Sequence, residues 1–76
     1  MTNTSRPDSY VLALTVIKNN VRTQIMQHQA FLSQLQKIVS DENYATAATD
    51  LEKSNITMMT TMTTDMLAQL KMIVWE

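Results

Sequence analysis

The 76-residue chain has no cysteine, no glycine and a single proline. Tight β-turns, bulges and phosphate-binding loops depend on residues that tolerate positive φ, chiefly glycine. The composition therefore disfavours an all-β fold, a P-loop and a dinucleotide-binding fingerprint. Without cysteine, the chain has no disulfides, no thiolate zinc site and no cysteine nucleophile.

Charge is also scarce. Charged residues make up 17% of the chain, hydrophobic residues 45%, and the net charge is −1. This composition is too apolar for a disordered chain. The six basic residues are dispersed and do not form the footprint of a strong phosphate binder, so no nucleic-acid site is assigned. An RNA-binding helical dimer is kept as the weakest alternative, with Lys18 and Arg22, one helical turn apart, as the pair to test.

The sequence has few residues that could support catalysis. His28 is the single histidine, the carboxylates are dispersed, and no Glu-x-x-His pair for a di-metal bundle occurs. The hydroxyl residues have no sequence context that would orient His28 as their general base. We therefore expect a protein that is not an enzyme, with no catalytic residues, no metal site, no cofactor and no small-molecule substrate.

Apolar periodicity predicts an all-α, antiparallel two-helix hairpin. The three- and four-residue spacing of apolar side chains predicts a first helix over about residues 7–39, with Pro7 near its start. The polar cluster 40–43 predicts the reversal, with Ser40 or Asp41 capping a second helix over about residues 42–75. The expected core stripe of the second helix is Tyr44, Ala48, Leu51, Met59, Met62, Met66, Leu70 and Ile73. We expect residues 6–76 to form one domain and residues 1–5 a flexible N-terminal segment.

The second helix has a weak point. Ser54 and Asn55 precede a threonine-rich stretch, and β-branched residues have poor helix propensity. The stretch does not alternate with a period of two, and no second strand is available to pair with it. A continuous helix is therefore preferred, and three helices with a break near Ser54–Asn55 are the alternative.

A reversal at residues 41–42 would place residue i opposite residue 83 − i. His28 and Asn55, which interrupt the two apolar stripes, would then be level with each other. We interpret them as a buried polar pair that sets the helix register, as buried polar residues do in coiled coils.

The beginning of the first helix and the end of the second helix, which meet at the end of the hairpin away from the turn, are apolar on nearly all sides. A helix pair buries one face of each member, so some of these side chains must stay exposed in an isolated hairpin. The sequence predicts a protein interface at Tyr10, Val11, Leu12, Val16, Met72, Val74 and Trp75.

Two functional classes fit this pattern. The first is a non-catalytic protein-interaction module, such as a small regulator or chaperone-like subunit, that uses an apolar helical surface. The second is a structural subunit of a repeating assembly such as a virion, tail or secretion apparatus. Either class implies a protein partner or self-association into a homodimer or larger helical bundle. No segment is long enough to span a bilayer and no convincing signal peptide is present, so a cytoplasmic location is expected.

Overall fold

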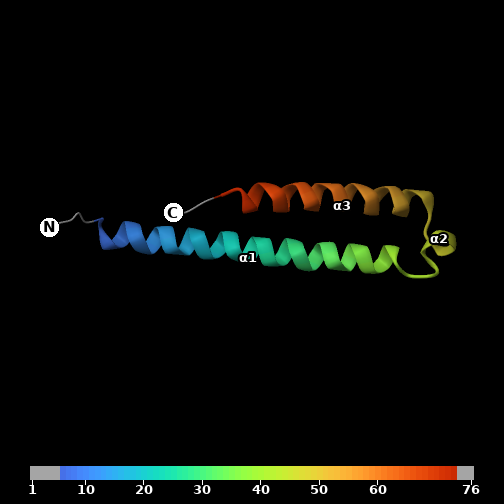
Figure 1. Cartoon of the computed structure of the whole chain (residues 1–76), viewed down its shortest axis with the longest axis horizontal. Helices are drawn as coiled ribbons and strands as arrows, with labels where there is room; N and C mark the ends of the chain where they lie inside the picture. Colours follow the sequence, from blue (N-terminus) through green and yellow to red (C-terminus); the bar gives the residue numbers. More distant parts are fainter. Residues whose placement is uncertain (1–5, 74–76) are drawn as a thin grey trace.

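The computed structural model describes residues 6–73, and these residues form helices and turns without strands. Helix α1 spans Asp8–Val39, α2 spans Tyr44–Ala47 and α3 spans Asp50–Lys71. Helices α1 and α3 run antiparallel and pack side by side, with the short α2 at the turn (Figure 1). The predicted all-α hairpin is confirmed; the segment 1–5 lies outside the described residues.

Helix α1 has the bounds that its periodicity predicts. Pro7 occupies the N-cap position, where its missing N–H leaves no helical hydrogen bond unmade. Asp8 in the first turn and Lys37 in the last have the charges that the helix dipole favours. The helix ends where the Ser40 hydroxyl donates to the carbonyl of Gln36, at 2.8 Å. Its 32 residues correspond to a rod about 48 Å long.

The second long helix starts later than the sequence pattern predicts. Asp41 does not cap a helix: its Oδ1 accepts from the Asn43 N–H at 2.8 Å and closes a local turn. After the single turn of α2, Ala48 and Thr49 are extended, with ψ of 135° and 163°. Helix α3 begins at the next residue, Asp50, and ends at Lys71, short of the predicted residue 75.

A capping box fixes the start of α3. The Glu52 N–H donates to Thr49 Oγ1 at 3.1 Å, and the Thr49 N–H donates to Glu52 Oε1 at 2.9 Å. Residues 6–73 therefore contain three helices, but the break lies at Ala48–Thr49. The alternative break near Ser54–Asn55 is wrong, because α3 is continuous through both residues.

The capping box gives a first test. Thr49→Ala removes the acceptor for the Glu52 N–H and is expected to lower the free energy of unfolding by about 1 kcal/mol. Thr49→Ser keeps the hydroxyl and should retain most of the stability. Urea denaturation at one fixed protein concentration measures both variants. Equal stability of Thr49→Ala and Thr49→Ser would show that the cap does not stabilise α3.

The threonine-rich part of α3 is helical, and several of its hydroxyls bond to backbone carbonyls of the same helix. Thr60 Oγ1 donates to the carbonyl of Ile56 at 2.7 Å, and Thr64 Oγ1 donates to that of Thr60 at 2.8 Å. Thr61 makes the same four-residue contact to Thr57, at 3.2 Å. These bonds satisfy hydroxyls that would otherwise compete for the backbone. The prediction of a helix here, rather than a strand, is confirmed.

The contact between α1 and α3 is a narrow seam with coiled-coil spacing. We define the seam as the partly or fully buried positions of the two helices, which alternate at three and four residues. In α1 they are Leu14, Lys18, Val21, Ile25, His28, Leu32 and Leu35; in α3 they are Lys53, Ile56, Thr60, Thr63, Leu67 and Leu70. Of these, only Leu35, Ile56, Thr63 and Leu67 are fully buried.

The predicted core stripe of α3 is largely wrong. Met59, Met62 and Met66 are exposed, and Thr60 and Thr63 take the inward positions instead. The predicted stripe followed the largest apolar side chains. The structure turns the neighbouring set of positions toward α1 and leaves the methionines outside.

The register between α1 and α3 also differs from the predicted register. The connection occupies residues 40–49, so the chain reverses near residues 44–45 and not at 41–42. A reversal at residues 44–45 places residue i opposite residue 89 − i, so Leu35 is level with Ser54 and not, as predicted, with Ala48. The register is therefore displaced by about two helical turns.

The two long helices have unequal lengths. Helix α1 has 32 residues and α3 has 22, which makes α1 about 15 Å longer. The excess lies at the end away from the turn, where the first turns of α1 extend beyond α3 (Figure 1). Among the described residues, this part of α1 has no helix beside it.

Candidate functional site

His28, the one candidate general base, lies partly buried in the seam. Its Nδ1 is 2.6 Å from the backbone carbonyl of Gln24, one turn earlier in the same helix. Residues 6–73 contain no group of three His, Cys, Asp or Glu side chains arranged to hold a metal ion. None of the helices in that range has the length and hydropathy needed to cross a membrane.

The predicted register-setting pair of His28 and Asn55 is not formed. Asn55 is exposed and lines a pocket beside the turn, together with Ile38 and Tyr44. His28 lies ten residues before Ile38 in α1, about 15 Å along the helix. Because Asn55 is exposed, the two side chains do not form a buried polar pair.

One side of the hairpin carries a row of mostly apolar side chains, which Gln24 in α1 and Glu52 in α3 interrupt. In α1, the residues that directly precede Val11, Lys18, Ile25, Leu32 and Val39 are spaced seven apart. All of them except Gln24 are apolar. In α3 the same rule gives Glu52, Met59, Met66 and Ile73, of which the last three are apolar. We name this set the apolar flank: Tyr10, Ile17, Phe31 and Ile38 from α1, and Met59, Met66 and Ile73 from α3 and the residues after it. Each side chain is 37–51% exposed, so it contacts the hairpin on one side and solvent on the other.

The opposite side of the hairpin is polar. The positions that directly follow every second seam residue, starting from Leu14 in α1 and from Ile56 in α3, define the polar flank: Thr15, Arg22, Gln29 and Gln36 in α1, and Thr57, Thr64 and Lys71 in α3. All seven are exposed. In an antiparallel helix pair, the residues before the seam in both helices lie on one side and those after it lie on the other. The hairpin is therefore strongly two-sided.

A pocket of about 490 Å³ lies at the turn, at one end of the apolar flank. Ile38 and Met59 of the flank line it, together with Tyr44, Ala47, Ala48 and Ile56. Asp41, Asn43, Glu52 and Asn55 add polar groups to the lining.

Lys53 holds α2 in place beside this pocket. Its Nζ donates to the carbonyl of Ala45 at 2.7 Å and lies 6.0 Å from the centroid of the Tyr44 ring. The pocket wall contributed by α2 is therefore tied to α3.

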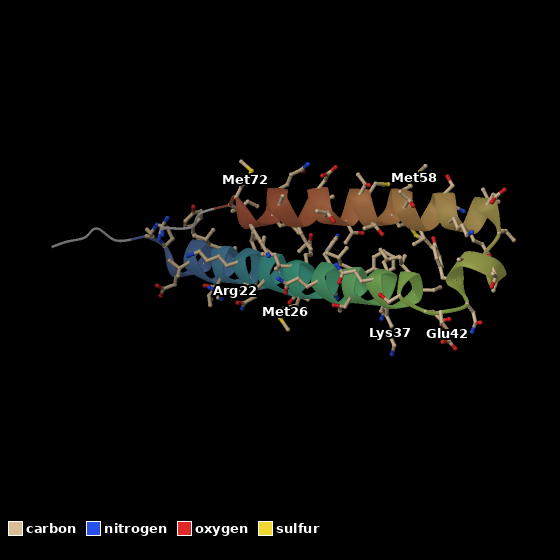
Figure 2. The ribbon with its side chains drawn as sticks, turned by 45° about the vertical axis from the view of Figure 1, so that its right-hand side comes forward. Arg22, Met26, Lys37, Glu42, Met58 and Met72 are labelled. Carbon is tan, nitrogen blue, oxygen red and sulfur yellow. The ribbon has the colours of Figure 1, made fainter. Side chains whose placement is uncertain are left out.

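Further apolar side chains point outward from both helices. Figure 2 shows Met58 and Met72 directed away from α1, and Met26 directed away from α3. We define the outer apolar residues as Leu12, Val16, Met26, Leu51, Met58, Met62 and Met72, which are 57–76% exposed.

The predicted interface residues are divided between these surfaces. Tyr10 belongs to the apolar flank and Val11 lies next to it, while Leu12, Val16 and Met72 are outer apolar residues. All five are exposed, and their role in an interface stays a prediction. Val74 and Trp75 lie outside the described residues.

Met59, Met66 and Ile73 were predicted as core residues of the second helix, so the part of the apolar flank on α3 was missed. A signal for the flank was present: it recurs with a period of seven, one residue ahead of the seam. Identifying it requires knowing which of the two adjacent stripes faces the other helix.

The basic pair proposed for an RNA contact lies one helical turn apart in α1, and its role in binding RNA stays a prediction. Lys18 is a partly buried seam residue, and Arg22 lies on the polar flank. Arg22 Nη1 donates to Asn19 Oδ1 at 3.1 Å.

Comparison of the chain with protein-family models, with curated proteins and with solved structures finds no match.

Proposed function

We propose that this protein is a non-catalytic helical interaction module, of the kind used as a small regulatory or chaperone-like subunit, and that the apolar flank is its contact surface. The observation that carries the proposal is the difference between the two sides of the hairpin. Seven apolar side chains line one flank, whereas hydroxyl, amide and basic side chains line the other. A surface that only has to be solvated has no need of this asymmetry.

The small number of buried residues in the seam also favours a partner, because a partner would bury more apolar surface. The fully buried apolar residues of the seam are Leu35, Ile56 and Leu67. For chains of this size, the stabilisation from burial roughly equals the loss of conformational entropy, even in a compact fold. Covering the apolar flank would remove further apolar area from water, at about 25 cal/mol per Å². Helices that complete a bundle on this side therefore supply both binding and stability.

The test replaces two flank methionines by glutamine. Glutamine keeps the length and helix propensity of methionine, so Met59→Gln with Met66→Gln removes apolar contact without disturbing α3. We expect complexes formed through the flank to weaken about a hundredfold, since two buried side chains each lose more than 1 kcal/mol. The measurement is the native mass of the complex containing this chain, taken from the cells that produce it.

The matched control is Met26→Gln with Met58→Gln, which makes the same chemical change at two side chains that point outward from the hairpin (Figure 2). This control should keep the native mass of the unmodified protein. Loss of the complex in both double variants, or in neither, would contradict the assignment of the apolar flank as the contact surface.

A structural subunit of a repeating assembly is the second candidate. The outer apolar residues support it, because a subunit buried by several identical neighbours needs more than one apolar surface. Light scattering separates the two functions. A fixed stoichiometry supports the module, and growth that continues with concentration supports the building block. The cytoplasmic location stays a prediction.

A further inference from the structure

The part of the apolar flank on α1 is symmetric about its centre. Tyr10, Ile17, Gln24, Phe31 and Ile38 recur every seven residues, with the one polar member in the middle. We propose that a second copy of this chain covers the flank, with the two α1 helices antiparallel and a two-fold axis at Gln24. This inference rests on the proposed function and names the partner of the same surface.

The two-fold axis makes every contact self-consistent. In an isologous interface, if residue i meets residue j of the second copy, then j also meets i. With the axis at Gln24, Ile17 meets Phe31 of the second copy, Tyr10 meets Ile38, and Gln24 meets itself. All the apolar positions of the row are then paired with apolar positions.

Gln24 suits the axis chemically. Its carboxamide has both donors and acceptors, so two copies related by the axis bond to each other without an unpaired group. Any other register would place this amide against an apolar side chain. A single polar residue in an apolar contact is a known means of fixing register.

The direction of the flank fits a four-helix arrangement. Successive residues of a helix are about 100° apart, so a row that directly precedes the seam lies roughly at a right angle to the seam direction. Each helix of a four-helix bundle has its two neighbours in such directions. Helix α1 would then contact α3 through the seam and the second copy through the flank.

The turn pocket provides a place for Tyr10 of the second copy. Ile38, the predicted partner of Tyr10, lines this pocket, and polar groups of Asn43 and Asn55 are available to the phenol hydroxyl. The pocket volume of about 490 Å³ is ample for one aromatic side chain.

Charge complementarity supports the same register. The Arg6 guanidinium stacks over the Tyr10 ring, 5.1 Å from its centroid, so the two side chains would arrive together. Arg6 is 18 residues before Gln24, and Glu42 is 18 residues after it. Arg6 directly precedes the start of α1 and Asp41 and Glu42 follow its end, so the antiparallel arrangement brings Arg6 of one copy to the end of α1 that carries these two carboxylates in the other.

The same arrangement explains the unequal helix lengths. The first turns of α1 extend beyond α3 within one hairpin (Figure 1). With the two-fold axis at Gln24, the first helical turns of α1 lie against the end of the second copy at which its chain reverses. At that end Phe31, Ile38 and Met59 form the flank.

Cross-linking of single-cysteine variants tests the geometry, since the chain has no cysteine of its own. Gln24→Cys is expected to give a covalent dimer with a short bismaleimide. A mixture of Tyr10→Cys and Ile38→Cys chains should cross-link to each other. Neither of these chains should cross-link alone, because the two equivalent sites would be about 42 Å apart along the helix axes. Gln29→Cys on the polar flank is the control and should stay monomeric in the reaction.

The results separate this inference from the function on which it rests. Far-UV circular dichroism first establishes that each exposed-site variant keeps the helix content of the unmodified chain. A Gln24→Cys yield no higher than that of Gln29→Cys, or efficient self-cross-linking of Tyr10→Cys, would overturn the proposed axis. If the axis is overturned while the Met59/Met66 variant still loses its native complex, the interaction module stands with a different partner.

Discussion

Replacing Ile17 by glutamate is expected to weaken self-association of the chain by about a thousandfold. The two-fold axis makes the change act twice, since each Ile17 meets Phe31 of the other copy. A carboxylate placed in an apolar contact without a partner costs at least about 2 kcal/mol per site. Two sites give about 4 kcal/mol, which corresponds to three orders of magnitude in Kd. Sedimentation equilibrium over a wide concentration range measures the change.

Gln29→Glu is the matched control for this experiment, because it introduces the same charge on the same helix but on the polar flank. We expect its Kd to stay within about threefold of the unmodified value, as is usual for a solvated surface charge. Ile17 is half exposed in the hairpin, so Ile17→Glu should leave the contact between α1 and α3 in place. Equal Kd values for Ile17→Glu and Gln29→Glu would contradict the role of the apolar flank.

Leu35→Ala is expected to lower the free energy of unfolding by about 3 kcal/mol. Leu35 is the most buried apolar side chain described, at 5% exposure, and its truncation leaves a cavity in a seam with few other buried residues. A loss of this size is a large fraction of the stability of a small domain. Urea denaturation followed by circular dichroism, at one fixed protein concentration, gives the difference.

Met26→Ala provides the comparison for Leu35→Ala. Met26 lies on the same helix and points away from α3 (Figure 2), so its truncation should change the stability by less than about 0.5 kcal/mol. If the two truncations had the same effect, the seam would not be the core of the hairpin.

The sequence predicted α1 almost to the residue, because its apolar spacing and its end signals agree. It predicted the start of α3 poorly, although the signal was present. Thr49 and Glu52 have the spacing of a capping box, but the polar cluster at residues 40–43 was taken as the cap instead. Asp41 uses its carboxylate within the turn, and this use cannot be distinguished from a helix cap by residue type alone.

The flank was harder to predict because α3 carries two adjacent stripes with the same period. One contains Thr60 and Thr63, and the other contains Met59 and Met66. Hydrophobicity favours the methionines as the core, but the register between the helices decides which stripe faces α1. The longer connection shifted that register, and the predicted pairing of His28 with Asn55 was lost for the same reason.

The mass of the purified, unmodified chain in solution tests the central claim most directly. Sedimentation equilibrium should give twice the chain mass of 8.7 kDa, with no growth beyond the dimer as the concentration rises. A fully helical species of 8.7 kDa at every concentration would contradict the claim that a second copy covers the apolar flank, and so would assembly that continues without limit.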